Sequence, residues 1–117
     1  MASRSFRDNN PGNIRLGPYA KALGAVDDGE GYAKFPDMAQ GLAAMVRLLC
    51  GPDYRTLNIA EVIEKFAPRE DHNDTMAYLK AVTNATGINP LIVFNHLDAY
   101  EIIDVIRAMI KQEGYRP

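Results

Sequence analysis

The last part of the chain, residues 97–117, carries the clearest pattern of hydrophobic and polar positions. Its apolar side chains recur at spacings of three and four residues, which predicts an amphipathic helix with one face turned inward. These side chains are Ile102, Ile103, Ile106, Met109 and Ile110. Asp98 is a favourable N-cap with Glu101 as its capping-box partner, and Gly114 supplies a left-handed stop. We therefore predict a helix between Asp98 and Gly114.

Glu113 continues this apolar periodicity, since it follows Ile106 by seven residues and Met109 by four. Its carboxylate is therefore expected along the buried face, at the negative end of the helix dipole. Both effects would raise its pKa above the ordinary value of about 4.3. A carboxyl group that keeps its proton near neutral pH suits general acid catalysis. The alternative is a solvated Glu113 near the end of the chain, and the register alone does not decide between the two.

The pattern predicts another helix after Pro36, with Asp37 as its cap and Gly51 at its end. An apolar stripe follows its expected inner face: Met38, Leu42, Met45, Val46 and Leu49. Three small residues, Gly41, Ala43 and Ala44, make this helix slim. We therefore expect it to approach its neighbours closely.

Two more helices are predicted in the middle of the chain. The first starts at Thr56 or Asn58 and ends before Pro68. The second starts at Asn73 or Asp74 and ends at Gly87. Their inward positions are Ile59, Val62, Ile63 and Phe66 in the first, and Tyr78, Leu79 and Val82 in the second.

The N-terminal third predicts a small β-hairpin. Residues 1–10 are polar and have no periodicity, so no element is expected there. Residues 14–16 and 32–35 are short extended segments that we expect to pair. Residues 17–31 between them form a predicted loop with three acids, Asp27, Asp28 and Glu30, and such a loop is solvated unless it forms the wall of a cleft. The expected fold is mainly α (α+β), a single domain over residues 1–117.

Composition narrows the possible partners. The chain has 13 basic and 15 acidic residues for a net charge of -2, and this mixture argues against nucleic acid as a partner. No apolar run is long enough to cross a membrane. The single Cys50 excludes an internal disulfide and is expected to be a buried, inert thiol. His72 and His96 show no ligand spacing, so we expect no metal and no cofactor.

The N-terminus lacks the apolar segment of a signal peptide. The protein is therefore expected to be made in the cytoplasm, and to act outside it only as part of a virion or through another delivery machine.

Carboxylate chemistry is the enzymatic option that the residues favour. Serine occurs only at Ser3 and Ser5, and the chain contains no P-loop and no G-x-S-x-G motif. An acid with a raised pKa in a small helical protein with a hairpin points to glycoside hydrolysis. A second carboxylate, a water or the acetamido group of the substrate would complete the reaction. Amide and aromatic side chains that suit a sugar are Asn9, Asn10, Asn13, Tyr32, Asn73 and Tyr78.

Several sequence runs together resemble a known family. The runs are Asn9-Asn10-Pro11-Gly12-Asn13-Ile14-Arg15, Gly31-Tyr32-Ala33-Lys34-Phe35, Gly41-Leu42, Ala67-Pro68 and Asn73-Asp74-Thr75 with Tyr78. They resemble the small phage and prophage "structural protein" domains of the lysozyme-like, peptidoglycan-cleaving superfamily. The resemblance covers nearly the whole chain, and the first run is its most specific part. Members of that group close with an apolar helix ending in an acid, like Glu113-Gly114 here.

The resemblance implies a circularly rearranged lysozyme plan, in which the hairpin comes first and the helix that ends in the catalytic Glu comes last. It implies a muramidase or lytic transglycosylase that acts on peptidoglycan glycan strands, with Glu113 as general acid. Asp28, or less favourably Asp27 or Glu30, would assist. The implied substrate-binding residues are Asn10, Asn13, Arg15, Tyr32, Asn73 and Tyr78. The alternative is a non-catalytic virion or secretion-apparatus protein that keeps the fold for structure or glycan binding.

Overall fold

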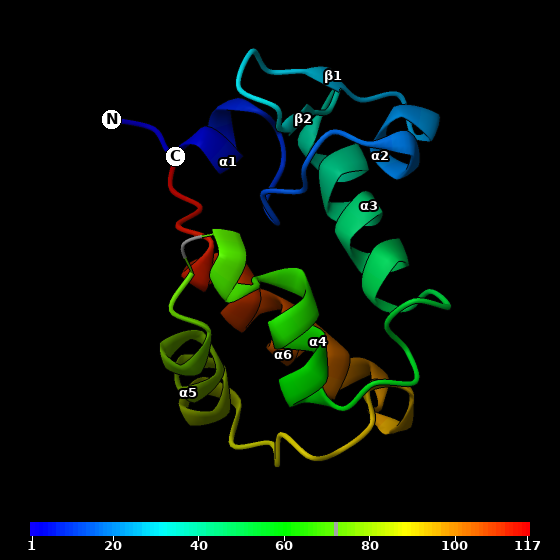
Figure 1. The fold of residues 1–117 in the computed structure, drawn as a ribbon, viewed down its shortest axis with the longest axis vertical. Helices are drawn as coiled ribbons and strands as arrows, with labels where there is room; N and C mark the ends of the chain where they lie inside the picture. The colour runs from blue at the N-terminus through cyan, green and yellow to red at the C-terminus, as the bar shows by residue number, and fades with distance from the viewer. Residues whose placement is uncertain (72) are drawn as a thin grey trace. The chain divides into compact units, whose positions relative to one another are not determined.

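The computed structural model describes residues 1–71 and 73–117. It is mainly helical with a small antiparallel sheet, which confirms the predicted fold class (Figure 1). Its elements are α1 (Arg4–Arg7), α2 (Pro18–Ala22), β1 (Val26–Asp27), β2 (Ala33–Lys34), α3 (Met38–Leu49), α4 (Ile59–Phe66), α5 (Thr75–Thr86) and α6 (Ala99–Gln112), with short 3-10 turns at Arg69–Asp71 and Phe94–His96.

The chain divides into two compact units. The first, which we call the N-terminal unit, comprises residues 1–47 and 113–117, and the second, the helical unit, comprises residues 48–112. A single domain over residues 1–117 was predicted, which requires the two units to fold together, and this stays a prediction.

The hairpin of the N-terminal unit differs in part from the predicted one. β2 forms within the predicted second strand, but its partner is β1, with Val26 opposite Lys34 and Asp27 opposite Ala33. The expected strand at residues 14–16 contributes a single bridge, Arg15 opposite Tyr32. The backbone N–H of Leu16 also donates to the carbonyl of Gly31, and that of Ala33 donates to the carbonyl of Ile14. The predicted pairing is therefore confirmed in part, and the pairing of β2 with β1 was not predicted. Side chains of the 27–32 turn accept hydrogen bonds from its own backbone, which reverses the chain tightly enough to pair β1 with β2.

Two short helices lie in segments for which no helix was predicted. In α1, the hydroxyl of Ser3 accepts a hydrogen bond from the backbone N–H of Phe6. In α2, Pro18 occupies the first helical position. Each helix has about one turn, which is too short to show a 3.6-residue periodicity, so the sequence pattern could not reveal it.

The Asn-rich run ties the start of the chain to β2. Asn10 is 1% exposed, donates through Nδ2 to the carbonyls of Ile14 and Ala33, and accepts from the backbone N–H of Ile14. Asn9 donates to the carbonyl of Phe35. Asn9 and Asn13 both have positive φ, which asparagine tolerates better than most residues. This run is therefore a structural clamp as well as a candidate site.

Helix α3 packs through its small residues in the N-terminal unit. Met45 and Leu49 of the predicted inner stripe are buried, which confirms that part of it. Leu42 and Val46 are exposed, and the small Gly41 and Ala44 are buried instead, so the stripe was wrong at those two positions. A Cβ on Gly41 would lie 1.7 Å from the carbonyl oxygen of Asn9. The small residues of α3 thus allow the close approach that was predicted. This contact with the backbone of Asn9 places Gly41 on the inner face of the helix. The apolar core of this unit contains Ala20, Ala25, Ala33, Phe35 and Ala44, with Ile14, Leu16 and Leu23 packed against it.

The helical unit contains the other three predicted helices, all confirmed. Asn58 caps α4 in a capping box with Glu61, and Gly87 ends α5 at φ 68°. Asp98 and Glu101 exchange hydrogen bonds at the start of α6. The buried apolar positions are Ile59, Val62 and Ile63 in α4, Tyr78 and Val82 in α5, and Val105, Ile106, Ala108 and Met109 in α6. Ile103, which was expected inside, is 48% exposed.

Candidate functional site

Glu113 follows the last residue of α6 directly and belongs to the N-terminal unit. Its side chain is half-buried, so it is not simply solvated. The amide Nδ2 of Asn13 donates to the carbonyl oxygen of Glu113 at 2.9 Å and to its Oε1 at 3.2 Å. One amide group thus fixes both the backbone and the carboxylate of the candidate acid. The expectation that Glu113 keeps its proton at neutral pH stays a prediction.

Arg4 connects this amide to the hairpin. Its Nε donates to Oδ1 of Asn13 at 3.4 Å, which is a long hydrogen bond. Its guanidinium carbon also lies 3.5 Å from the ring centroid of Tyr32, and that of Arg15 lies 4.8 Å from the same centroid. Both arginines are within the range of cation–π attraction to the ring. The ring of Tyr32, at the end of the hairpin turn, is therefore held by two arginines from the first 15 residues.

Asp28 is fixed within the 27–32 turn. Its Oδ1 accepts hydrogen bonds from the backbone N–H of Glu30 at 2.7 Å and of Tyr32 at 3.1 Å. Its own backbone N–H donates to the carbonyl of Tyr32 at 3.0 Å. A hydrogen bond with the side chain of Asp8 is the largest cause of the lowered pKa of Asp28, and the charge of Arg4 also lowers it. This carboxylate is therefore ionised and oriented.

Asp8 is the partner of Asp28. It is 6% exposed, and its Oδ2 is buried with no hydrogen-bond donor within reach among residues 1–71 and 73–117. Burial, followed by the hydrogen bond with Asp28 and the repulsion between the two acids, raises the pKa of Asp8 to about 6. The charges of Lys34 and Arg7 oppose this rise. A hydrogen bond between two carboxyl groups requires a proton, and the raised pKa of Asp8 beside the lowered pKa of Asp28 assigns this proton to Asp8 below about pH 6.

These contacts join six residues of the N-terminal unit, which we call the site network: Asp8, Asp28, Tyr32, Arg4, Asn13 and Glu113. Sequence reasoning found four of them. It missed Arg4 and Asp8, because both lie in a polar segment without periodicity. The available signal was the position of Asp8, directly before the Asn-rich run.

The other predicted residues occupy different surroundings. Asn10 is buried with both amide hydrogens used internally, which favours a structural role, and its sugar contact stays a prediction. Arg15 is exposed beside Tyr32. Asp27 accepts from the backbone N–H groups of Gly29 and Gly31, so it shapes the turn.

Asn73 and Tyr78 belong to the helical unit. Asn73 donates to the carbonyl of Pro68 at 3.0 Å. Tyr78 is buried, and its hydroxyl donates to the carbonyl of Met109 at 3.3 Å, which links α5 to α6. Their part in sugar binding stays a prediction.

Cys50 is exposed, so the expectation of a buried thiol was wrong. The helix ends at Leu49, which is buried, and the next residue turns outward. Partial desolvation still raises the pKa of the Cys50 thiol, so it is mostly protonated and a poor nucleophile. His72 lies outside the described residues, and His96 is exposed.

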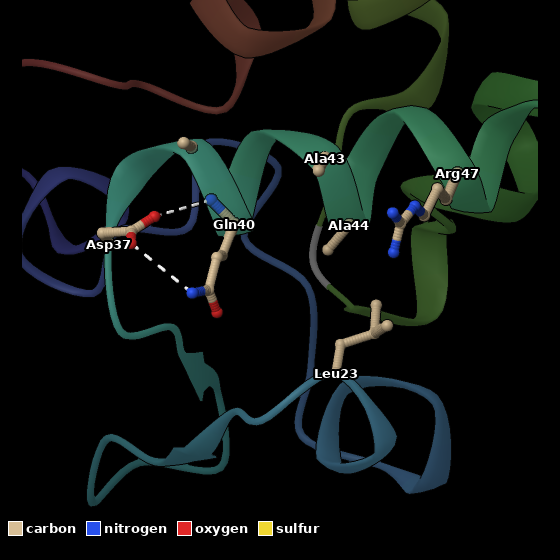
Figure 2. Close-up of a pocket in the computed structure, with 7 residues that line it drawn as sticks. Leu23, Asp37, Gln40, Ala43, Ala44 and Arg47 are labelled. Carbon is tan, nitrogen blue, oxygen red and sulfur yellow. Dashed lines mark hydrogen bonds between the residues drawn. The ribbon is translucent and has the colours of Figure 1, made fainter.

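A pocket of about 330 Å³ lies between α3 and the end of α2 (Figure 2). Its lining is Leu23, Asp37, Ala39, Gln40, Ala43, Ala44 and Arg47. Asp37 accepts hydrogen bonds from the backbone N–H and the side-chain amide of Gln40, so its carboxylate already serves to cap α3. This pocket contains no member of the site network.

Fold and site thus define a small, mainly helical protein in which acids, an amide and an arginine are joined in one network. No model of a protein family matches the chain. The chain is similar to Protein P5 of Pseudoalteromonas phage PM2, with 34% identity over 96 residues, which cover 74% of this chain and 58% of that protein. It thus spans somewhat more than half of its relative, and the similarity supports a phage origin. None of the described helices is long and apolar enough to cross a membrane.

Proposed function

We propose that this protein cleaves the glycan strands of peptidoglycan, with Glu113 as the acid that protonates the glycosidic oxygen. The observation that carries the proposal is the double hydrogen bond from Asn13 to the carbonyl and carboxylate of Glu113. A general acid must be held in one direction relative to the leaving oxygen, and this contact supplies that restraint. The half-buried position of Glu113 supports the same role.

Asp28 is the second carboxylate in the muramidase version of the proposal. Its lowered pKa and its two backbone hydrogen bonds suit an ionised group that positions water or stabilises an oxocarbenium-like transition state. In the lytic transglycosylase version, Glu113 acts first as acid and then as base, and Asp28 is not required. The site network is compatible with both versions, and the product distinguishes them.

The sugar-binding part of the proposal centres on Tyr32. Its ring, with Arg15 exposed beside it, offers an aromatic surface and a cation to a glycan. Asn13 already holds Glu113, so we assign it the positioning of the acid. The proposal therefore uses Tyr32, Arg15 and Asn13, which all belong to the N-terminal unit.

The test is the release of soluble muropeptides from purified cell walls, followed by mass spectrometry. Removing a general acid costs about 10²- to 10⁴-fold in rate, so we expect Glu113→Gln to lose at least about 100-fold. Glu64→Gln, which changes an exposed acid of α4, is the matched control and should release fragments at the wild-type rate. An anhydro sugar in the product identifies a transglycosylase, and a hydrated reducing end identifies a muramidase. Undiminished release by Glu113→Gln would remove Glu113 from the mechanism.

A second candidate is a non-catalytic virion or secretion-apparatus protein that binds glycan or other assembly proteins. The similarity to a phage protein supports a phage origin, which is compatible with both candidates. It predicts that the wild-type protein binds cell walls but releases no soluble fragments. Delivery within a virion or by another machine belongs to either candidate.

A further inference from the structure

Asp8 is anchored through its backbone, and its side chain is buried beside Asp28. It is the C-cap of α1, where its backbone N–H donates to the carbonyl of Arg4, and its own carbonyl accepts from the backbone N–H of Phe35 at 2.9 Å. Both backbone groups are therefore fixed, and the side chain is 6% exposed. An ionised Asp8 would leave a buried oxygen without a donor among the described residues, next to a second negative charge.

Asp28 is the link between this buried acid and the turn. The same carboxylate that accepts the hydrogen bond from Asp8 also accepts from the backbone N–H groups of Glu30 and Tyr32. A change in the position of Asp28 must therefore disturb the 27–32 turn and the backbone of Tyr32. The charges of Arg7 at the end of α1 and Lys34 on β2 act on Asp8, and that of Arg4 acts on Asp28. The acids Asp27 and Glu30 lie on the same turn as Asp28.

We propose that Asp8 is a positioning residue that locks the 27–32 turn, and with it Tyr32, by donating a hydrogen bond from its protonated carboxyl group to Asp28. When this proton leaves to solvent, the hydrogen bond between the carboxyl groups is lost, the two acids repel each other and the turn loosens. The lock is therefore closed in mild acid and opens as pH rises through about 6, where Asp8 ionises. Only its consequence for glycan cleavage rests on the proposed function.

Hydrogen exchange of the Glu30 and Tyr32 amides between pH 4 and 8 tests the lock without any assay of activity. After correction for intrinsic exchange, the wild type should lose at least about tenfold protection with a midpoint near pH 6. In Asp8→Asn, the side-chain amide can donate to Asp28 at every pH, so protection should stay constant. Asp27→Asn is the matched control, since its Oδ1 can still accept from Gly29 and Gly31 while Asp8 is unchanged. It should keep the transition.

Two results would overturn the lock: a wild type without a transition, or a transition that persists in folded Asp8→Asn. If Asp8→Asn does not fold, carboxyl ¹³C shifts of the wild type decide. Asp8 must then titrate near pH 6 with Asp28 responding at the same pH, and independent titration would contradict the proposal.

The consequence for cleavage is tested by the pH profile of muropeptide release. Wild-type release should fall above about pH 6, whereas in Asp8→Asn the fall should move to higher pH or vanish. A wild type that releases nothing at any pH would defeat the proposed function, and the lock would still be judged by hydrogen exchange. Identical profiles in both proteins would show that the lock has no part in cleavage.

Discussion

Single polar side chains of the N-terminal unit each satisfy several groups at once. Asn10 bonds to Ile14 and to Ala33, and Asn13 bonds to two oxygens of Glu113 while it accepts from Arg4. Asparagine suits these positions because it offers two donors and an acceptor, and because it tolerates the positive φ found at Asn13. Asp8 is the exception, since one of its buried oxygens lacks a donor among the described residues.

The stability of the fold should therefore depend on the ionisation of Asp8. Its pKa is raised from 3.8 to about 6, so folding favours its protonated form. The stability that this group contributes is complete below about pH 3.8 and is lost as pH rises through about 6. We expect Asp8→Asn to be more stable than the wild type at pH 8 by about 1 to 3 kcal/mol, and the difference to shrink toward pH 4.

Urea unfolding of both proteins at several pH values measures this difference. The lowered pKa of Asp28 has the opposite effect on stability. The stability that Asp28 contributes is present at neutral pH and is lost only as pH falls below the ordinary pKa of a carboxyl group. Between about pH 4 and 7, the difference in stability between the two proteins therefore reports the ionisation of Asp8, because the other groups are common to both proteins. A constant difference across that window would contradict the assignment of the proton to Asp8.

At the scale of elements, α3 shows how a small residue overrides an apolar pattern. Leu42 and Val46 are more hydrophobic than Gly41 and Ala44, yet the smaller pair is buried. The carbonyl of Asn9 occupies the space where a Gly41 side chain would begin. Backbone contact at this distance fixes the rotation of the helix, which leaves Leu42 and Val46 outward and Met45 buried.

Gly41→Ala should be strongly destabilising, although alanine favours a helix over glycine by about 1 kcal/mol. The added Cβ would lie 1.7 Å from a backbone oxygen, which cannot move aside like a side chain. We expect a loss of at least about 3 kcal/mol in the free energy of unfolding. Leu42→Ala on the same helix is the control and should cost less than about 1 kcal/mol, because Leu42 is 40% exposed. Equal costs for the two variants would contradict the close contact between Gly41 and the backbone of Asn9.

At the scale of the whole molecule, the two ends of the chain meet in the N-terminal unit (Figure 1). The backbone N–H of Ser3 donates to the carbonyl of Arg116 at 3.0 Å, and the rings of Phe6 and Tyr115 lie 5.8 Å apart. Residues 113–117 thus complete a unit whose other members are the first 47 residues. The helical unit is formed by residues 48–112 and has its own buried positions.

Deletion of residues 113–117 should therefore weaken the N-terminal unit selectively. The amides of Ala33 and Phe35, which bond to Ile14 and Asp8, should lose protection from hydrogen exchange. The amides of Val62 and Ala67 in and after α4 are the internal control and should keep theirs. Equal loss of protection in both sets would mean that the two units unfold together, as the single-domain prediction requires.

The sequence alone determined the helices of residues 58–112 closely, because caps and apolar periodicity act between residues three or four positions apart. Asn58 with Glu61 and Asp98 with Glu101 are such local pairs, and the structure contains both. The same periodicity placed Glu113 on the inward side, where it is half-buried.

Only the tertiary structure decided what surrounds that acid. Asn13 and Glu113 are 100 positions apart, and Asp8 meets Asp28 across the hairpin. Such pairs leave no periodic trace in the sequence, since their geometry depends on how β1, β2 and α3 pack. The pairing of β2 with β1 was not predicted, and the inner face of α3 was predicted only in part, for the same reason. Contacts between distant residues, and not local preference, chose them.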